Sequence, residues 1–371
     1  MSLPKNIRVI ISGGGTGGHI FPAIAIANAL KAIDPTIELL FVGAEGKMEM
    51  EKVPAAGFVI EGLPIAGIKR ELALSNLSFP LKLMLSLTKA SSIIKKFQPD
   101  VAVGVGGYAS GPLLFSANRR KIPSLIQEQN SFPGITNKIL SRKAKKICVA
   151  YEGMDRFFPK DKIVLTGNPV REDIRMIDGK KNDASKFFQL DIHRQTILVV
   201  GGSQGARSIN HAVFAGLSKI ADSGVQLIWQ TGKSFLTQAK TAIEKLNTTS
   251  IHAFDFISRM DLAYAMADIV VARAGASTVS ELCIVKKPAI LVPLPTAAED
   301  HQTKNCMSLV DHDAAILVAD KDAQLKLINE ALLLINNSDL RMQLAANIAR
   351  LARPDAANEI AQQVLSLIKN K

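Results

Sequence analysis

Short apolar runs alternate with longer mixed segments along almost the whole chain. Apolar runs bounded by glycine, proline or polar clusters are typical of buried strands, and the segments between them are long enough for helices. This alternation predicts an α/β protein with parallel sheets that helices cover on both faces. The expected strands lie at residues 7–12, 37–42, 101–105, 123–127, 146–150, 163–166, 196–200, 225–230, 251–254, 268–272 and 288–292.

Two of these strands run directly into a glycine-rich turn. The first turn occupies residues 13–19 and the second occupies residues 201–206, each followed by a predicted helix. Such a turn aims backbone N–H groups and the positive end of a helix dipole at an anion, usually a phosphate. The alternative is a structural turn in which glycine only permits close packing. Two such units predict two nucleotide-type domains that face one cleft.

The length of 371 residues fits two domains of ordinary size. We expect a Rossmann-like N-terminal domain over residues 1–170 and a Rossmann-like C-terminal domain over residues 171–350. The boundary falls at the Gly-Asn-Pro-Val-Arg segment of residues 167–171. Residues 351–371 predict an amphipathic helix from Pro354 onward that returns to the first domain.

The first turn fits the G-x-G-x-x-G pattern through Gly13, Gly15 and Gly18. A dinucleotide-binding fold also places an acidic residue at the end of its second strand, and here Glu45 comes late. This argues against a dinucleotide cofactor. His19 begins the next helix, where the dipole favours a neutral imidazole that could serve as a general base. A purely structural histidine is the alternative.

Polar residues also follow two strands of the second half. Residues 276–281 offer helix-capping side chains and Glu281, a carboxylate that could hold a ribose diol or simply cap the helix. Residues 299–305 are polar and suggest either a sugar-binding rim or a solvated loop. Glu128 and its amide neighbours end a strand of the first half, where they could bind sugar hydroxyls.

The charge is concentrated in the N-terminal half. Residues 1–170 hold 22 Lys and Arg against 12 Asp and Glu, whereas residues 171–371 hold 23 against 21. Aromatic residues make up only 5%, which disfavours nucleic acid as a partner. Residues 72–97 mix leucines with lysines, which predicts either a membrane-contacting surface or an ordinary packed helix.

Other targeting and redox signals are sparse. The three cysteines lie far apart without metal-ligand spacing, which indicates a reducing compartment and no metal site. No apolar run reaches the roughly 18 residues of a membrane span, and no signal peptide is expected at the N-terminus.

Seven motifs occur in an order and spacing that resemble one family. They are Gly-Gly-Thr-Gly-Gly-His at 14–19, Gly-Gly-Tyr at 106–108, Glu-Gln-Asn at 128–130, Gly-Asn-Pro-Val-Arg at 167–171, Gly-Gly-Ser-Gln-Gly-Ala at 201–206, Ser-Thr-Val-Ser-Glu at 277–281 and Asp-His-Gln-Thr-Lys-Asn at 300–305. The chain resembles the MurG family of bacterial N-acetylglucosaminyltransferases, which convert lipid I to lipid II in peptidoglycan synthesis. The likeness covers about residues 7–360.

The resemblance implies a GT-B glycosyltransferase fold, with UDP-GlcNAc held mainly by the C-terminal domain and the acceptor on the N-terminal, membrane side. It implies His19 and Glu281 as the catalytic residues, with Glu281 on the donor ribose. The donor-binding residues it implies are Thr16, Gly17, Gly18, Asn130, Arg171, Ser203, Ile257, Ala276, Ser277, Thr278, Val279, Ser280, Glu281 and Gln302. It implies no metal and no cofactor. The chain departs from the family pattern at Gln127, where histidine is frequent, and at Cys306, where alanine is common.

The implied reaction is an inverting hexosyl transfer from UDP-GlcNAc to the C4 hydroxyl of undecaprenyl-pyrophosphoryl-MurNAc-pentapeptide. The family works as a peripheral protein on the cytoplasmic face of an anionic cell membrane, in cell-wall biogenesis, cell shape and cell division. Proteins of cell-wall synthesis or division are therefore expected partners. Two alternatives stay open, namely a UDP-GlcNAc epimerase on the same fold and a non-catalytic membrane-associated scaffold.

Overall fold

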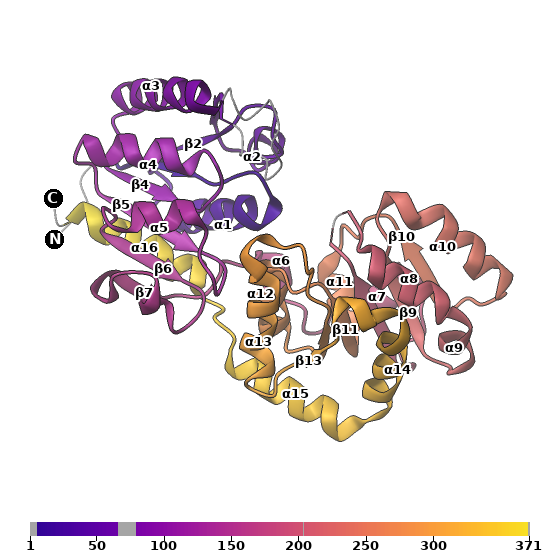
Figure 1. The fold of residues 1–371 in the computed structure, drawn as a ribbon. Helices are drawn as coiled ribbons and strands as arrows, with labels where there is room; N and C mark the ends of the chain where they lie inside the picture. Colours follow the sequence, from indigo (N-terminus) through magenta and orange to yellow (C-terminus); the bar gives the residue numbers. More distant parts are fainter. Residues whose placement is uncertain (1–5, 66–78, 203, 370–371) are drawn as a thin grey trace. The chain divides into compact units, whose positions relative to one another are not determined.

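A computed structural model describes residues 6–65, 79–202 and 204–369 of the chain, which form two compact units (Figure 1). The N-terminal unit comprises Met1–Arg171 and Pro354–Lys371, and the C-terminal unit comprises Glu172–Arg353. The structure therefore divides the chain directly after the Gly-Asn-Pro-Val-Arg segment and again just before Pro354.

The N-terminal unit is built on a seven-stranded parallel sheet in the order β3-β2-β1-β4-β5-β6-β7. Its strands are β1 (Arg8–Ser12), β2 (Glu38–Ala44), β3 (Ile60–Leu63), β4 (Val101–Gly104), β5 (Ser124–Glu128), β6 (Lys146–Val149) and β7 (Ile163–Leu165). Its helices are α1 (Gly17–Ile33), α2 (Glu49–Ala55), α3 (Phe79–Phe97), α4 (Ser110–Arg119), α5 (Ile135–Ser141) and α16 (Ala356–Lys369).

Side chains alternate across this sheet and create a core on each face. Val9 and Ile11 of β1 join the core that α1 and α16 cover. Ile10, between them, faces the opposite core, which α3, α4 and α5 cover. The last helix of the chain, α16, thus completes the N-terminal unit, with Ile360 and Val364 fully buried.

The C-terminal unit has a six-stranded parallel sheet in the order β10-β9-β8-β11-β12-β13. Its strands are β8 (Thr196–Val200), β9 (Gln226–Gln230), β10 (Ile251–Phe254), β11 (Ile269–Ala272), β12 (Ala289–Leu291) and β13 (Ile316–Leu317). Its helices are α6 (Glu172–Arg175), α7 (Lys181–Phe188), α8 (Arg207–Ala215), α9 (Leu217–Asp222), α10 (Lys233–Lys245), α11 (Met260–Met266), α12 (Ala276–Val285), α13 (His301–Val310), α14 (Ala323–Asn336) and α15 (Ser338–Arg350).

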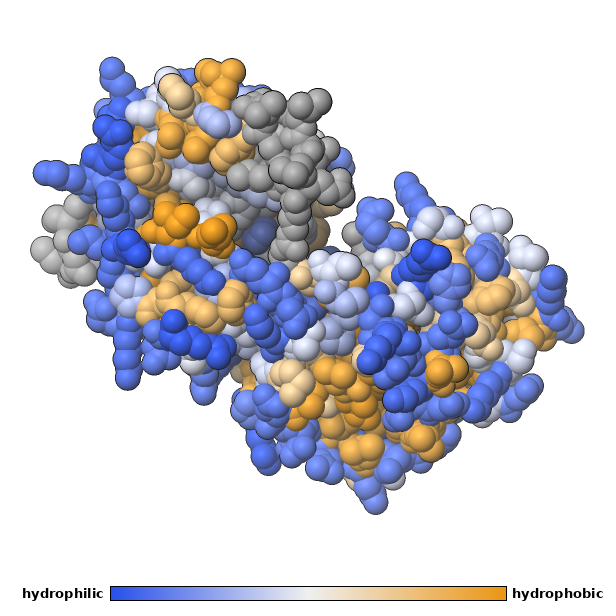
Figure 2. Space-filling model, in the orientation of Figure 1, coloured by the Kyte–Doolittle hydropathy of each residue, from blue (hydrophilic) through white to orange (hydrophobic). Residues whose placement is uncertain are grey.

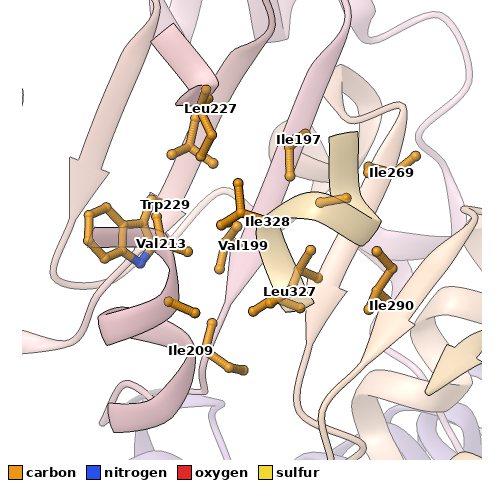
Figure 3. Packing of buried hydrophobic residues seen from close by; sticks show 14 of the residues in the cluster. Ile197, Val199, Ile209, Val213, Leu227, Trp229, Ile269, Ile290, Leu327 and Ile328 are labelled. Atoms are coloured by element: carbon orange, nitrogen blue, oxygen red, sulfur yellow. The ribbon is translucent and has the colours of Figure 1, made fainter. Parts of the chain in front are cut away.

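The core of the C-terminal unit lies between the sheet and helices α8 and α14 (Figure 3). Val199 and Trp229 project from neighbouring strands toward Val213 of α8 and Leu327 of α14. Trp229 is fully buried, and its indole N–H donates to Asn210 Oδ1 at 3.1 Å, so its polar atom is satisfied inside the core.

A cluster of ion pairs around the buried Asp261 joins the start of α7 to α11 in the same unit. The side chain of Asp261 is only 2% exposed and accepts hydrogen bonds from Arg259 and from Lys180 Nζ, at 2.8 Å and 3.0 Å. The hydrogen bond from Arg259 and the nearby Lys180 charge hold the pKa of the Asp261 carboxyl below its usual range, despite its burial.

The observed architecture confirms the predicted parallel α/β fold and adds two strands that the sequence pattern did not indicate. These are β3 and β13, one at an edge of each sheet. Both are short and mostly half-buried, so neither has the continuous apolar run of a central parallel strand.

Candidate active site

The first glycine turn follows β1 and is packed tightly against the loop that follows β4. The Gly14 N–H lies 3.4 Å from the Gly106 carbonyl oxygen. Gly106 and Gly107 both have positive φ, and a Cβ on Gly107 would stand 2.3 Å from the Gly14 carbonyl oxygen. Only glycine therefore fits at Gly107, where both backbone conformation and space exclude a side chain.

His19 lies in the first turn of α1, with its ring over Gly106. Its Nδ1 is 3.0 Å from the Gly14 carbonyl oxygen and 3.4 Å from Thr16 Oγ1. A carbonyl can only accept, so this geometry assigns the proton of the neutral imidazole to Nδ1 and the lone pair to Nε2. Gly17 and Gly18 share this first turn, where backbone N–H groups have no partner within the helix.

A residue that sequence reasoning missed, Glu49, reaches this turn from the start of α2. Its carboxylate accepts the Gly15 N–H at 2.9 Å and the Ala44 N–H at 3.0 Å, and the residue is 1% exposed. The available signal was its place shortly after β2, because the carboxyl ends of β1 and β2 lie at the same end of the sheet and the first turn follows β1 there. Glu45, the acid considered for a ribose, instead pairs with Lys89 at 2.8 Å on the surface.

Asn130 lies just beyond β5 in a loop organised by Glu128. The Glu128 carboxylate accepts the Asn130 backbone N–H at 3.0 Å and the Asn137 side-chain amide at 2.8 Å. Burial raises the pKa of Glu128 even though these hydrogen bonds favour its charged form. Asn168 stabilises the same loop. Its Oδ1 accepts a hydrogen bond from Gln127 Nε2 at 2.9 Å, and its Nδ2 donates to the Gln129 carbonyl oxygen at 2.9 Å.

The motif at residues 167–171 is thus tied into the loop of residues 127–130 through Asn168. Arg171 is the last residue of the first segment of the N-terminal unit, and its guanidinium lies 6.0 Å from the ring centre of Phe21 on α1. Within the N-terminal unit, these contacts link the segment before Arg171 to the end of β5 and place Arg171 near α1.

In the C-terminal unit, the second glycine turn forms one wall of a pocket of about 820 Å³. The pocket opens at the carboxyl ends of the strands, where ligands bind in parallel α/β sheets. Ser203 lies outside the described residues. The pocket is lined by Gly201, Gly202, Gly205, Ala206, Arg207, Ser208, His211, Arg273, Gly275, Thr278, Leu294, Pro295, Thr296, Gln302, Asp320, Lys321 and Gln324.

Helix α12 presents its N-terminus to this pocket through Gly275 and Thr278. Ala276, Ser277 and Thr278 make up its first turn, which is suited to an anion. The Val279 N–H donates to the Gly275 carbonyl at 2.9 Å and the Val279 side chain is buried, while Ser280 is half-buried.

Glu281 follows in α12 and is held by a tyrosine that the sequence did not suggest. The Tyr264 hydroxyl donates to Glu281 Oε2 at 2.9 Å, and Tyr264 is 1% exposed. The buried Tyr264 hydroxyl therefore holds the Glu281 carboxylate in place.

Gln302 and Ile257 are held by two further contacts. Gln302 Oε1 accepts the Leu294 N–H at 3.0 Å, so its Nε2 is the group that can donate to a ligand in the pocket. The Ile257 N–H donates to Gln230 Oε1 at 2.8 Å, and Gln230 Nε2 donates to the Gly202 carbonyl at 3.0 Å. Gln230 therefore bridges the second glycine turn and the segment that holds Ile257.

Arg273 lines the pocket and stabilises its wall through hydrogen bonds. Its guanidinium donates to Asp320 and to Ser208 Oγ, and also to the carbonyls of Val292 and Pro293. Its charge is thus balanced inside the protein by Asp320, and it braces the loop after β12 against the start of α8.

The predicted site residues therefore form two groups, one in each unit. Thr16, Gly17, Gly18 and His19 gather at the first turn of α1, and Asn130 and Arg171 belong to the same unit. Thr278 and Gln302 line the pocket of the C-terminal unit, while Ile257 and Glu281 are held beside it in that unit by Gln230 and Tyr264. Within the described residues, no cluster of three or more His, Cys, Asp or Glu is arranged to hold a metal ion.

Comparisons with known proteins identify the family of the chain. The glycosyltransferase family 28 N-terminal domain matches residues 9–149, and the family 28 C-terminal domain matches residues 196–363. The chain is 53% identical over 366 residues to a protein of Phocaeicola vulgatus, covering 98% of this chain and 97% of that one. That relative is named UDP-N-acetylglucosamine–N-acetylmuramyl-(pentapeptide) pyrophosphoryl-undecaprenol N-acetylglucosamine transferase. A crystal structure of Acinetobacter baumannii MurG matches with a TM-score of 0.78 at 29% identity, covering 97% of this chain and 99% of that one.

The chain belongs to the MurG family. The two units described above are the Rossmann-like domains of the GT-B fold that this family shares. A putative UDP-N-acetylglucosamine 2-epimerase of Listeria monocytogenes has a TM-score of 0.72 at 13% identity, covering 99% of this chain and 98% of that one. At that identity the likeness concerns the fold alone, so it gives no support to the epimerase alternative against MurG membership.

Proposed function

We propose that this protein transfers N-acetylglucosamine from UDP-GlcNAc to the C4 hydroxyl of lipid I, giving lipid II for peptidoglycan synthesis. The observation that carries the proposal is 53% identity over nearly the whole chain to a protein named for that transfer. The pocket between the second glycine turn and the start of α12 supports it, because a helix N-terminus beside a glycine turn suits a diphosphate.

The C-terminal unit holds the donor in this proposal. The first turn of α12 and the second glycine turn bind the diphosphate, with Ser203 and Arg171 as further contacts. Glu281 accepts from the ribose hydroxyls, and Gln302 donates from Nε2 to the sugar, which Asn130 also contacts. The carbonyl of Ile257 accepts the uracil N3–H, since the Ile257 N–H already donates to Gln230.

The reaction proceeds with inversion and without a metal. The C4 oxygen of the muramyl unit bonds to the anomeric carbon of GlcNAc as the bond from that carbon to the UDP oxygen breaks. His19 Nε2 removes the C4 hydroxyl proton, while the His19 Nδ1–H keeps its hydrogen bond to the Gly14 carbonyl oxygen. The negative charge that grows on UDP is stabilised by the α12 N-terminus, by backbone N–H groups of the second turn and by Arg171.

One assay separates this function from its two alternatives. The protein is given UDP-GlcNAc with and without a lipid-linked muramyl-pentapeptide acceptor, and both UDP release and conversion of UDP-GlcNAc to another sugar product are measured. The proposed transferase releases UDP only with the acceptor. Turnover without the acceptor would indicate an epimerase, and absence of turnover in both samples would indicate a non-catalytic scaffold.

The N-terminal unit carries features suited to an anionic membrane surface. Leu81 and Met84 of α3 and Ile135 and Ile139 of α5 are each 61–68% exposed, and Figure 2 shows hydrophobic surface on this unit. Exposed Lys and Arg at residues 119–121 and 142–143 border these helices. Residues 72–78 of the predicted membrane segment lie outside the described residues. No described helix is both long and apolar enough to cross a bilayer.

We therefore propose peripheral binding to the cytoplasmic face of the cell membrane through α3 and α5. Met84→Glu and Ile139→Glu should each reduce pelleting with anionic liposomes several-fold. Leu325→Glu is the control, since Leu325 is 79% exposed on the C-terminal unit. Wild-type binding should weaken as salt rises, because exposed charges are screened. Binding that is indifferent to salt would contradict a role for the basic residues.

A further inference from the structure

Glu49 is a buried carboxylate that the reaction proposed above does not use. It lies at the start of α2 and is 1% exposed. Two glycines far apart in the sequence make room for it. A Cβ on Gly14 would stand 2.1 Å from Glu49 Oε1, and a Cβ on Gly43 would stand 2.6 Å from Glu49 Cγ.

Burial of a carboxylate is costly unless hydrogen bonds compensate it. Glu49 gains two from backbone groups, the Ala44 N–H at 3.0 Å and the Gly15 N–H at 2.9 Å. The second of these brings a carboxylate to the turn that precedes His19. The anion that this part of the first turn holds is therefore a side chain of the protein itself.

The two ends of one peptide group connect Glu49 to His19. The Gly15 N–H, which donates to Glu49, belongs to the same planar peptide as the Gly14 carbonyl. That carbonyl oxygen accepts from His19 Nδ1 at 3.0 Å. A carboxylate on the N–H end fixes the plane of the peptide and polarises its carbonyl, because hydrogen bonds in a chain strengthen one another.

We propose that Glu49 is a positioning residue for His19, acting through the peptide between Gly14 and Gly15. Its role resembles that of the third residue of a catalytic triad, because it fixes the ring orientation of His19 and keeps the proton on Nδ1. Unlike a triad residue, it acts through a peptide group and does not contact the histidine directly. The Gly15 N–H is then engaged with Glu49 and is not a donor to a substrate phosphate. This inference rests on the proposed role of His19 as general base.

The test is a double-mutant cycle on the full-length protein with UDP-GlcNAc and a lipid-linked muramyl acceptor. Glu49→Gln keeps the size of the side chain but removes its charge, and its NH₂ group opposes one of the two backbone N–H donors. We expect kcat to fall by about 10-fold or more, as for a partly disabled general base, with KM for UDP-GlcNAc within about two-fold of wild type. Glu51→Gln is the matched control, because Glu51 is 77% exposed and pairs only with the neighbouring Lys52 among the described residues.

The His19→Ala background decides how Glu49 acts. If Glu49 works through His19, Glu49→Gln lowers kcat in the wild type but causes no further loss in His19→Ala. An equal loss in both backgrounds, or an unchanged kcat in Glu49→Gln, would overturn the inference. A near-normal kcat in His19→Ala alone would instead overturn the general-base proposal. If Glu49→Gln does not fold, Glu49→Asp keeps the charge with a shorter reach and is taken through the same cycle with the same expected pattern.

Discussion

Replacing Tyr264 with phenylalanine should weaken UDP binding by removing a single hydroxyl group. In the structure that hydroxyl donates to Glu281 Oε2 at 2.9 Å from a side chain that is 1% exposed. Glu281 is the residue proposed to accept from the ribose hydroxyls. Without the tyrosine hydroxyl, Glu281 samples more rotamers in the free protein and must be ordered when the nucleotide binds.

The size of the effect follows from that ordering cost. Immobilising one rotamer-rich side chain on binding costs about 0.5–1.5 kcal/mol, which corresponds to a rise in Kd of about 2- to 12-fold. Titration calorimetry of Tyr264→Phe with UDP measures this change directly. Thermal unfolding measured alongside establishes that the variant is folded at the temperature of the titration.

A modified nucleotide serves as the control for this prediction. The nucleotide 2′,3′-dideoxy-UDP lacks the ribose hydroxyls, so Tyr264→Phe and the wild type should bind it equally well. An unchanged Kd for UDP would refute the reasoning. So would an equal weakening for both nucleotides, because the loss would then not pass through the ribose contact of Glu281.

Three further predictions concern other sites. His19→Ala should lower kcat about 100-fold or more while leaving the Kd of UDP unchanged, and a near-normal kcat would remove His19 from the role of base. Asp261→Asn should lower the free energy of unfolding in urea by about 1–3 kcal/mol at pH 7. The substitution removes the buried negative charge that pairs with the partly exposed Lys180 and Arg259. Because the folded pKa of Asp261 is depressed, its contribution is complete above the unfolded value and is lost as pH falls through the folded value. The deficit should therefore be smaller at pH 3 than at pH 7, and a deficit that does not change with pH would contradict the ion-pair explanation. Burial raises the pKa of Cys148, Cys283 and Cys306 to about 12. At pH 8 the native protein should therefore react slowly with a thiol reagent, whereas all three thiols should react in guanidinium. A thiol that reacts fast in the native state would contradict their burial.

The central strands of both sheets could be predicted from the sequence because they are buried on both faces and appear as continuous apolar runs. Two of the four edge strands, β3 and β13, could not. Residues 316–317 form only a two-residue strand, and residues 60–63 include Glu61 and Gly62, so neither segment carries that pattern. Their assignment depends on pairing with β12 and β2, which is a tertiary contact rather than a local preference.

The candidate site divides in the same way. Glycine turns and helix starts, such as those before His19 and Thr278, are local and visible in the sequence. The residues that support them are not. Glu49 reaches the first turn only because β1 and β2 are neighbours in the sheet, and Tyr264 meets Glu281 across two helices. Gln230 likewise joins Gly202 to Ile257 only once β9 lies between β8 and β10.

The anomeric configuration of the transferred sugar tests the proposed function most directly. The purified protein is incubated with isotopically labelled UDP-GlcNAc and a lipid-linked muramyl-pentapeptide, and the lipid product is isolated and examined by mass spectrometry and NMR. Inverting transfer to the muramyl C4 oxygen predicts a lipid-linked disaccharide in which GlcNAc is β-linked at that oxygen. An α-linkage, attachment at another hydroxyl, or label recovered only in free sugar would contradict it.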